Sequence, residues 1–155
     1  MTLFKLTAQS KQLQDRFAET NCTFANLGSF LNIDQYQMEC KAANLFTTGK
    51  LFLKDLLNLS SMEVSINALK PNEKASFNHY HVNNEELYLV LKGNGKLTVD
   101  NKEYSLQEGS VAAVLPKGVR RVDAKEDGLI FICIQAKQGS LTACTLDDGK
   151  SSDAL

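Results

Sequence analysis

The chain has 155 residues, of which 43% are hydrophobic, and its 17 basic and 18 acidic residues leave a formal net charge of −1. This length predicts one domain, and the balanced charge argues against nucleic acid as the main partner, because proteins that bind nucleic acids carry a basic face. No apolar run is long enough to span a membrane, and residues 1–12 lack the apolar core of a secretory signal. With four scattered cysteines and no Cys-x-x-Cys pair, the sequence predicts a cytoplasmic protein with reduced thiols.

The first part of the chain, residues 1–57, is predicted to be an extension that packs on the following domain or across a dimer. Within it, residues 10–20 place apolar side chains four apart, which is the spacing of a short amphipathic helix. Residues 34–43 open with a pattern that resembles a capping pair, so a second short helix is expected there. Residues 51–59 are apolar and fit either a helical turn or a strand.

From residue 62 onward the pattern changes to that of β-strands. Apolar and polar residues alternate over residues 62–68, which is the period of a half-buried strand. Further strands are predicted at residues 76–82, 86–92, 96–99, 102–106, 111–115, 119–124, 129–136 and 141–146. Short strands in such number predict an all-β barrel or sandwich over residues 58–146. The polar residues 147–155 are expected to form a flexible tail.

Two of the connections between these strands have specific turn signals. Asp100 and Asn101 stand between two strand patterns, as in a two-residue hairpin loop. Gly93-Asn94-Gly95 is predicted to form a tight turn between two separate strands. Both connections are too short to contain another helix or strand.

The only two histidines of the chain, His79 and His81, stand two residues apart in a predicted strand. Residues i and i+2 of a strand point to the same face, so both imidazoles are expected to point to one place. Neutral imidazole together with a carboxylate suits divalent Zn, Fe, Mn, Ni or Cu. Glu85 and Glu86 open the next predicted strand, so one of these carboxylates is expected to complete a three-ligand site with open positions.

The segment that contains these residues resembles the first motif of the cupin superfamily, which is roughly G-x5-H-x-H-x3–4-E-x6-G. Four residues separate the second histidine from Glu86, and six more separate Glu86 from Gly93. The resemblance therefore implies Glu86 as the third metal ligand, with Glu85 as the runner-up. The first glycine of the motif is absent. The implied fold is a small single-domain jelly-roll β-barrel with a short, partly helical N-terminal extension.

The second cupin motif is roughly G-x5-P-x-G-x2-H-x3-N, and this chain departs from it. Pro-x-Gly begins at Pro116, but six residues rather than five separate it from Gly109, and the histidine position falls on Arg121. Arginine is always charged and has no lone pair to give, so it cannot replace a metal ligand. Two possibilities follow. Either the metal is held by the two histidines and the glutamate alone, with waters, or no metal is bound.

Arg120 and Arg121 both stand near the implied pocket, and the sequence leaves open which of them points inward. Alternation with the apolar residues that follow favours Arg120, whereas alignment with the motif favours Arg121, and a bulge would shift the parity. Either guanidinium suits a carboxylate or phosphate, and Tyr88 shares the strand parity of Glu86. The predicted ligand is therefore a small carboxylate, a phosphorylated sugar or an acidic sugar, bound by Tyr88 and one of the arginines.

The resemblance implies a cupin that binds a small molecule in its barrel with a divalent metal (Zn, Mn, Fe or Ni), acting as a metal-dependent isomerase or oxygenase. One alternative is a non-catalytic cupin that binds an anion or sugar-like ligand without metal, and another is a dimerising module with a degenerate pocket. Whether the protein is an enzyme stays open, because this fold hosts many activities. Similar cupins are often dimers, and long exposed strand edges favour pairing, so a homodimer is expected.

Overall fold

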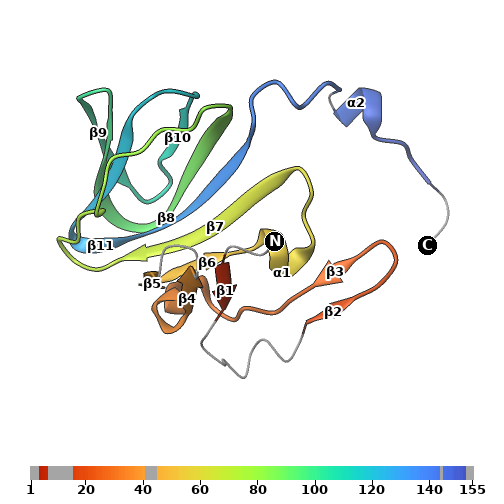
Figure 1. The fold of residues 1–155 in the computed structure, drawn as a ribbon, viewed down its shortest axis with the longest axis horizontal. Coiled ribbons are helices and arrows are strands. Elements are labelled where there is room, and N and C mark those ends of the chain that lie inside the picture. The colour runs from red at the N-terminus through yellow and green to blue at the C-terminus, as the bar shows by residue number, and fades with distance from the viewer. Residues whose placement is uncertain (1–3, 7–15, 41–44, 144, 153–155) are drawn as a thin grey trace.

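The computed structural model describes residues 4–6, 16–40, 45–143 and 145–152, and strands dominate it (Figure 1). In chain order the elements are β1 (Phe4–Leu6), β2 (Phe17–Ala18), β3 (Thr23–Phe24), a 3₁₀ helix (Phe30–Gln35), β4 (Gln37–Cys40), β5 (Leu45–Thr48), β6 (Lys50–Phe52), α1 (Lys54–Leu57), β7 (Met62–Leu69), β8 (Asn84–Val99), β9 (Lys102–Gln107), β10 (Val111–Val114), β11 (Arg120–Lys137) and α2 (Thr145–Asp148). The all-β fold predicted from the sequence is confirmed. Among the described residues, no helix has the length and hydrophobicity needed to cross a bilayer.

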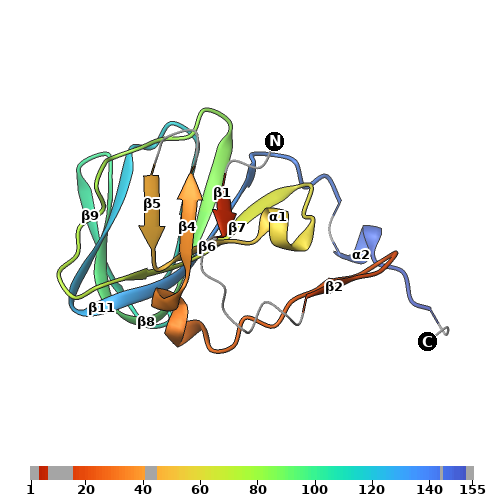
Figure 2. The same ribbon diagram turned by 60° about the horizontal axis from the view of Figure 1, so that its bottom comes forward.

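An antiparallel six-stranded sheet forms the barrel, with the order β10-β8-β11-β7-β6 and with β9 paired to β8. The first half of β8 pairs with β10 and the second half with β9, so one long bent strand serves two parts of the barrel wall. These strands curl around a common interior, which Figure 1 shows at the upper left. The β2–β3 hairpin and α2 project away from the barrel in both views (Figures 1 and 2).

Two hydrophobic cores lie on opposite faces of the barrel sheet. The inner core lines the inside of the barrel and contains residues of β8, β9, β10 and β11, including Tyr88 and Phe131. The outer core joins the N-terminal region to the outer face of β6 and β7, through Ile33, Tyr36 and Ile66 among others. Because β6 already pairs with β7, the barrel sheet includes part of the segment assigned to the extension. The division at residue 57 stays a prediction.

The tight turn predicted at Gly93-Asn94-Gly95 is wrong, because β8 continues through these residues. The register of β8 against β11 shifts here, between Ala124 and Leu129, which marks a β-bulge. Gly93 has a φ of 85°, and a Cβ at this position would meet the carbonyl oxygen of Gly128 at 2.1 Å. The glycine therefore permits a close approach of two backbones rather than a reversal of the chain.

The hairpin loop predicted at Asp100 and Asn101 is confirmed between β8 and β9. Both residues have positive φ values, 47° and 68°, as the two-residue loop of a right-twisted hairpin requires. The Asp100 carboxylate also accepts a hydrogen bond from the backbone of Val119 at 2.9 Å, which ties this loop to the start of β11. The local residue types alone were sufficient to identify this turn.

The helices predicted in the N-terminal region are not formed in the described residues. Of the helix predicted over residues 10–20, residues 10–15 lie outside the described part, and Phe17–Ala18 is strand β2, with the Phe17 ring stacked on Phe24. Of the helix predicted over residues 34–43, residues 41–43 lie outside the described part, and the remainder is the end of a 3₁₀ helix and β4. Tertiary packing decides this, because Met38 of β4 is buried in the outer core. Residues 51–59 contain both the end of β6 and the short helix α1.

Two of the predicted strands are also absent. Residues 76–82 form no named strand, and only an isolated bridge pairs His79 with Arg120. Among the described residues of 141–146 no strand forms, and residues 145 and 146 begin α2 instead. Leu141 and Leu146 are exposed, so no sheet surface is available to cover them. Alternation of apolar residues predicts a strand only where a neighbouring strand can pair with it.

Candidate metal and ligand site

Glu86 is the centre of a polar cluster inside the barrel. It lies on β8 and is 5% exposed. Its Oε2 accepts hydrogen bonds from the Tyr88 hydroxyl at 2.5 Å and from the Arg120 Nε at 2.8 Å. Its Oε1 lies 2.9 Å from the His81 Nε2 and 3.5 Å from the Cys133 Sγ. Four side chains from three parts of the chain thus surround one buried carboxylate.

The alternation of β8 decides which of the two adjacent glutamates enters the barrel. Glu86, Tyr88 and Val90 are buried on the inner face, whereas Leu87 is exposed on the outer face. Glu85 belongs to the outer set by the same alternation. The geometry therefore favours Glu86 over Glu85 as the carboxylate that meets the histidines.

The two histidines are held by backbone hydrogen bonds to the segment that leads into β11. The amide of His79 donates to the carbonyl of Arg120 at 3.1 Å, and the amide of Arg120 donates to the carbonyl of His79 at 2.8 Å. The carbonyl of His81 accepts a hydrogen bond from the amide of Lys117 at 2.8 Å. The imidazole centroids are 5.4 Å apart. An extended segment without a full strand pairing therefore still directs both rings to Glu86, as the i, i+2 spacing predicted.

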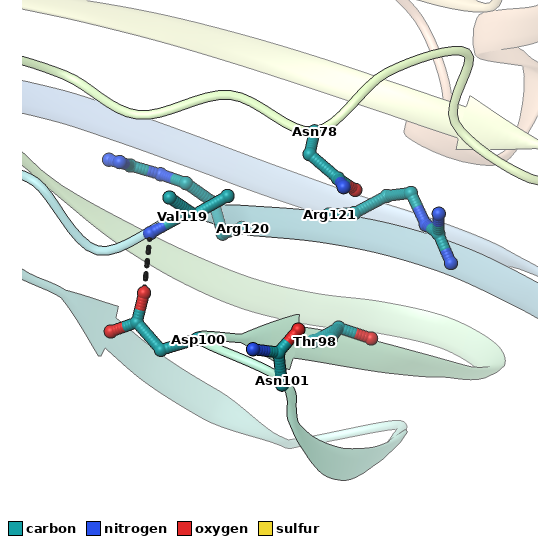
Figure 3. A pocket seen from close by; sticks show the side chains of 7 residues that line it. All are labelled: Asn78, Thr98, Asp100, Asn101, Val119, Arg120 and Arg121. Atoms are coloured by element: carbon teal, nitrogen blue, oxygen red, sulfur yellow. Dashed lines mark hydrogen bonds between the residues drawn. The ribbon is translucent and has the colours of Figure 1, made fainter.

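Figure 3 shows that Arg120 and Arg121 point in opposite directions from the start of β11. Arg120 is 1% exposed and reaches Glu86, and its Nη1 donates to the carbonyl of Gly118 at 2.7 Å. The Arg120 Nη2 is buried and has no hydrogen-bond partner. Arg121 instead pairs with Asp123, with 3.0 Å between Nε and Oδ1. The inward side chain is therefore that of Arg120, which the alternation of apolar residues favoured. Alignment with the second cupin motif had favoured Arg121.

Arg121 lines a separate, small polar pocket beside the loop that carries the histidines (Figure 3). The pocket has a volume of about 230 Å³ and is also lined by Asn78, Thr98, Asp100, Asn101, Val119 and Arg120. The pair of ligand-binding arginines predicted from the sequence is therefore divided between two locations. Arg120 contacts the cluster around Glu86, and Arg121 does not.

The hydrogen bonds of the cluster determine its protonation states. Burial alone would raise the pKa of Glu86, but the hydrogen bonds from its neighbours outweigh burial and hold that pKa well below its usual range. Burial raises the pKa of the Tyr88 hydroxyl, which remains a donor. Burial and the charge of Glu86 raise the pKa of the Cys133 thiol to about 12, so Cys133 is not a thiolate nucleophile.

The donor set fits a divalent metal ion. One ligand atom from each of His79, His81 and Glu86 lies within 4.8 Å of the others. Ligands bound at ~2.1 Å lie roughly 3–3.5 Å apart. The His81 Nε2 is 2.9 Å from the Glu86 Oε1, and the His79 Nε2 is 3.8 Å from the Glu86 Oε2. Arg120 already binds Oε2, which leaves Oε1 as the carboxylate oxygen for an ion. An ion would need the lone pair of the His81 Nε2, so the tautomer of His81 that binds it carries its proton on Nδ1.

Cys133 is a member of the cluster that was not identified from the sequence. It lies in an apolar run of β11, and only the pairing of Cys133 with Tyr88 across two strands brings it to Glu86. The free thiol of Cys133 is buried and that of Cys22 is exposed. Because residues 129–136 are nearly all apolar, no local pattern shows which face Cys133 takes or specifies its partner on β8.

Comparison with known proteins identifies related chains. The family model of the cupin domain matches residues 66–134. A cupin protein from Bacteroides fragilis is 39% identical, with a TM-score of 0.65 over 66% of this chain and 88% of that chain. A sugar phosphate isomerase from a cupin superfamily, from Silicibacter pomeroyi, is 29% identical, with a TM-score of 0.50 over 57% of this chain and 60% of that chain. An uncharacterized protein of Methanocaldococcus jannaschii is 29% identical over 56 residues, 36% of this chain and 45% of that protein, so the match spans less than half of that relative.

Proposed function

Because the chain belongs to the cupin family, we propose that it is a metal-dependent isomerase that binds a small anionic molecule, of the sugar phosphate kind, in its barrel. The observation that carries this proposal is the convergence of His79, His81 and Glu86 on one point inside the barrel. A metal ion bound there would act as a Lewis acid that polarises a carbonyl or hydroxyl oxygen of the ligand. The isomerase from Silicibacter pomeroyi supports an isomerase over an oxygenase.

The side chains around the metal ligands have separate tasks in this proposal. Tyr88 and Arg120 hold the Glu86 carboxylate in one orientation through hydrogen bonds to Oε2. The buried Nη2 of Arg120 has no partner in the protein, so it is available to donate a hydrogen bond to an oxygen of the ligand. Tyr88 therefore acts on the ligand through Glu86, and Arg120 contacts the ligand itself.

The first prediction concerns the metal. We expect one divalent ion per chain, bound by His79, His81 and Glu86, and we expect the double substitution His79→Ala and His81→Ala to abolish this binding while the fold is retained. Two of the three ligands are then missing, and a single carboxylate is a poor site. The measurement is elemental analysis of the purified protein, followed by titration with Zn, Mn, Fe, Ni and Co. Circular dichroism verifies the fold of the variant.

Glu85→Gln is the matched control, because Glu85 is adjacent in sequence but belongs to the outer face of β8. This variant is expected to bind the ion as the wild type does. If neither the purified protein nor the titrations show an ion at this site, the metal-dependent function is wrong.

A non-catalytic cupin that binds an anionic ligand without metal is the second candidate function. The ion pair between Arg120 and Glu86, at 2.8 Å, favours it, because the guanidinium already neutralises the carboxylate that a metal would need. The effect of a chelator on ligand binding distinguishes the two candidate functions. Ligand binding that is unchanged by a strong chelator supports the candidate without metal.

We also infer a homodimer, and this is the second prediction. The apolar residues 51–59 that suggested it are partly used within the chain, since Leu51 is buried in the outer core. Other apolar side chains are exposed, notably Leu87 on β8 and Val111 on β10, and β10 is the last strand in the sheet order. Two copies packed against each other through the outer face beside β10 would cover them. Light scattering at micromolar concentration should give twice the monomer mass, and Val111→Glu should shift it toward the monomer. A monomeric wild type contradicts the inference.

A further inference from the structure

Lys50, the first residue of β6, lies on the inner face of the barrel sheet. Side chains alternate along a strand, and the next residue, Leu51, is 1% exposed in the outer core. The side chain of Lys50 therefore projects from the opposite, inner face. The strand register agrees, because Lys50 is paired with the buried Asn67, and Asn67 is paired with Phe131 of the inner core.

The ammonium of Lys50 is directed toward the part of the wall that carries Glu86. Its Nζ lies 4.9 Å from the ring centroid of Phe52, which is two residues further along β6. Asn67, the β7 partner of Lys50, donates a hydrogen bond to the hydroxyl of Ser65 at 3.0 Å, and Ser65 is paired with Cys133, so the inner face leads from Lys50 to Cys133. The Cys133 Sγ is 3.5 Å from the Glu86 Oε1. The charge of Glu86 therefore acts on Lys50, as does that of Glu63 on β7.

Within the described part of the chain, Lys50 has no carboxylate within ion-pair distance, and its Nζ contacts the ring of Phe52. Burial lowers the pKa of Lys50, because a desolvated ammonium without a nearby anion is costly. Arg120 is different, since Glu86 neutralises its charge at 2.8 Å. Lys50 is therefore a cation of the inner face whose charge is left for a ligand.

We propose that Lys50 binds the phosphate or carboxylate group of the small molecule that the barrel holds, while the other end of that molecule lies at His79, His81 and Glu86. This inference rests on the proposed function and narrows its substrate class. The ligand carries an acidic group at one end and hydroxyl or carbonyl oxygens at the other. A neutral sugar leaves Lys50 without a partner, and a site with an unsatisfied buried group discriminates against such a molecule.

Isothermal titration calorimetry tests this with four acids: glucose 6-phosphate, ribose 5-phosphate, gluconate and galacturonate, each beside its neutral parent sugar. Lys50→Met removes the charge and keeps most of the stem, Lys50→Arg keeps the charge, and Lys54→Met removes an exposed lysine of α1 as the matched control. We expect at least one acid to bind the wild type and Lys50→Met to weaken it about ten- to a hundredfold. Lys50→Arg and Lys54→Met should bind it nearly as the wild type does.

Three results would overturn the inference: no binding of any of the four acids by the wild type, equal affinity of the wild type and Lys50→Met for an acid, or equal weakening of the acid and its neutral parent. Metal content measured on the same samples keeps this test separate from that of the metal site. Lys50→Met that takes up metal normally but binds the acid weakly supports the inference. A metal-free wild type that binds the acid through Lys50 removes the metal from the proposed function and leaves this inference intact.

Discussion

Replacement of Arg120 by leucine is expected to lower the free energy of unfolding by about 3–5 kcal/mol, because it leaves a buried carboxylate without its cation. The Arg120 Nε is 2.8 Å from the Glu86 Oε2, and the Nη1 is 2.7 Å from the carbonyl oxygen of Gly118. Leucine can make neither contact. For a chain of this size the loss corresponds to a decrease in Tm of roughly 6–20 °C. Urea unfolding followed by circular dichroism measures it.

Arg121→Leu is the control for this substitution, since it removes the adjacent arginine from the outer side of the same strand. Asp123, the partner of Arg121, is also buried, but Arg121 itself is partly exposed and the Asp123 carboxylate keeps a hydrogen bond from the amide of Ala75, so this variant should lose less, about 1–2 kcal/mol. The double variant Arg120→Leu with Glu86→Gln removes both charges, so it should be less destabilised than the sum of its single variants. If Arg120→Leu unfolds at the same urea concentration as Arg121→Leu, the buried ion pair does not contribute as the structure indicates.

Gly93→Ala is expected to destabilise the protein by about 2–5 kcal/mol, for two reasons that add. Gly93 has a φ of 85°, a conformation that costs an L-residue about 1–2 kcal/mol. The new Cβ would also lie 2.1 Å from the carbonyl oxygen of Gly128 and 2.9 Å from its carbonyl carbon. Both atoms belong to the backbone of β11, so one strand must move, and overpacking of this kind costs about 1–3 kcal/mol. Thermal and urea unfolding measure the change.

Gly109→Ala separates the two contributions. Gly109 has a similar φ of 81°, but a Cβ there would have no atom within 4 Å. Gly109→Ala should therefore lower the free energy of unfolding only by the cost of placing an L-residue at positive φ, about 1–2 kcal/mol. The difference between the two variants isolates the close approach at the bulge. Equal losses for both variants would show that β8 and β11 are not in close contact at Gly93.

Features that depend on residues close together in the chain were determined by the sequence. Alternation over residues 62–68 predicted β7, because a half-buried strand needs only a period of two. Asp100 and Asn101 predicted the hairpin because both tolerate positive φ values. His79, His81 and Glu86 also lie within one short stretch. Their convergence therefore required only an extended backbone and the correct face of β8.

The tertiary structure decided the features that depend on strand register and bulges. From the sequence, Gly93 was interpreted as part of a turn. In the structure β8 continues through Gly93, and the glycine is needed there because the backbone of Gly128 approaches it at a bulge in the pairing of β8 with β11. The choice between Arg120 and Arg121 depended on which face of β11 meets Glu86. Motif alignment pointed to Arg121, whose side chain extends in the opposite direction from Arg120 (Figure 3) and pairs with Asp123.

The same reason explains why the sequence did not place Cys133 beside Glu86 or Lys50 on the inner face of the sheet. Their positions depend on the pairing of β6 with β7, β7 with β11 and β11 with β8. Each pairing joins strands that are far apart in the chain, and a shift of one residue in any of them would turn the side chains to the other face. Local residue patterns specify that a strand forms and which residues share a face. The long-range hydrogen bonds between strands determine which of those residues meet.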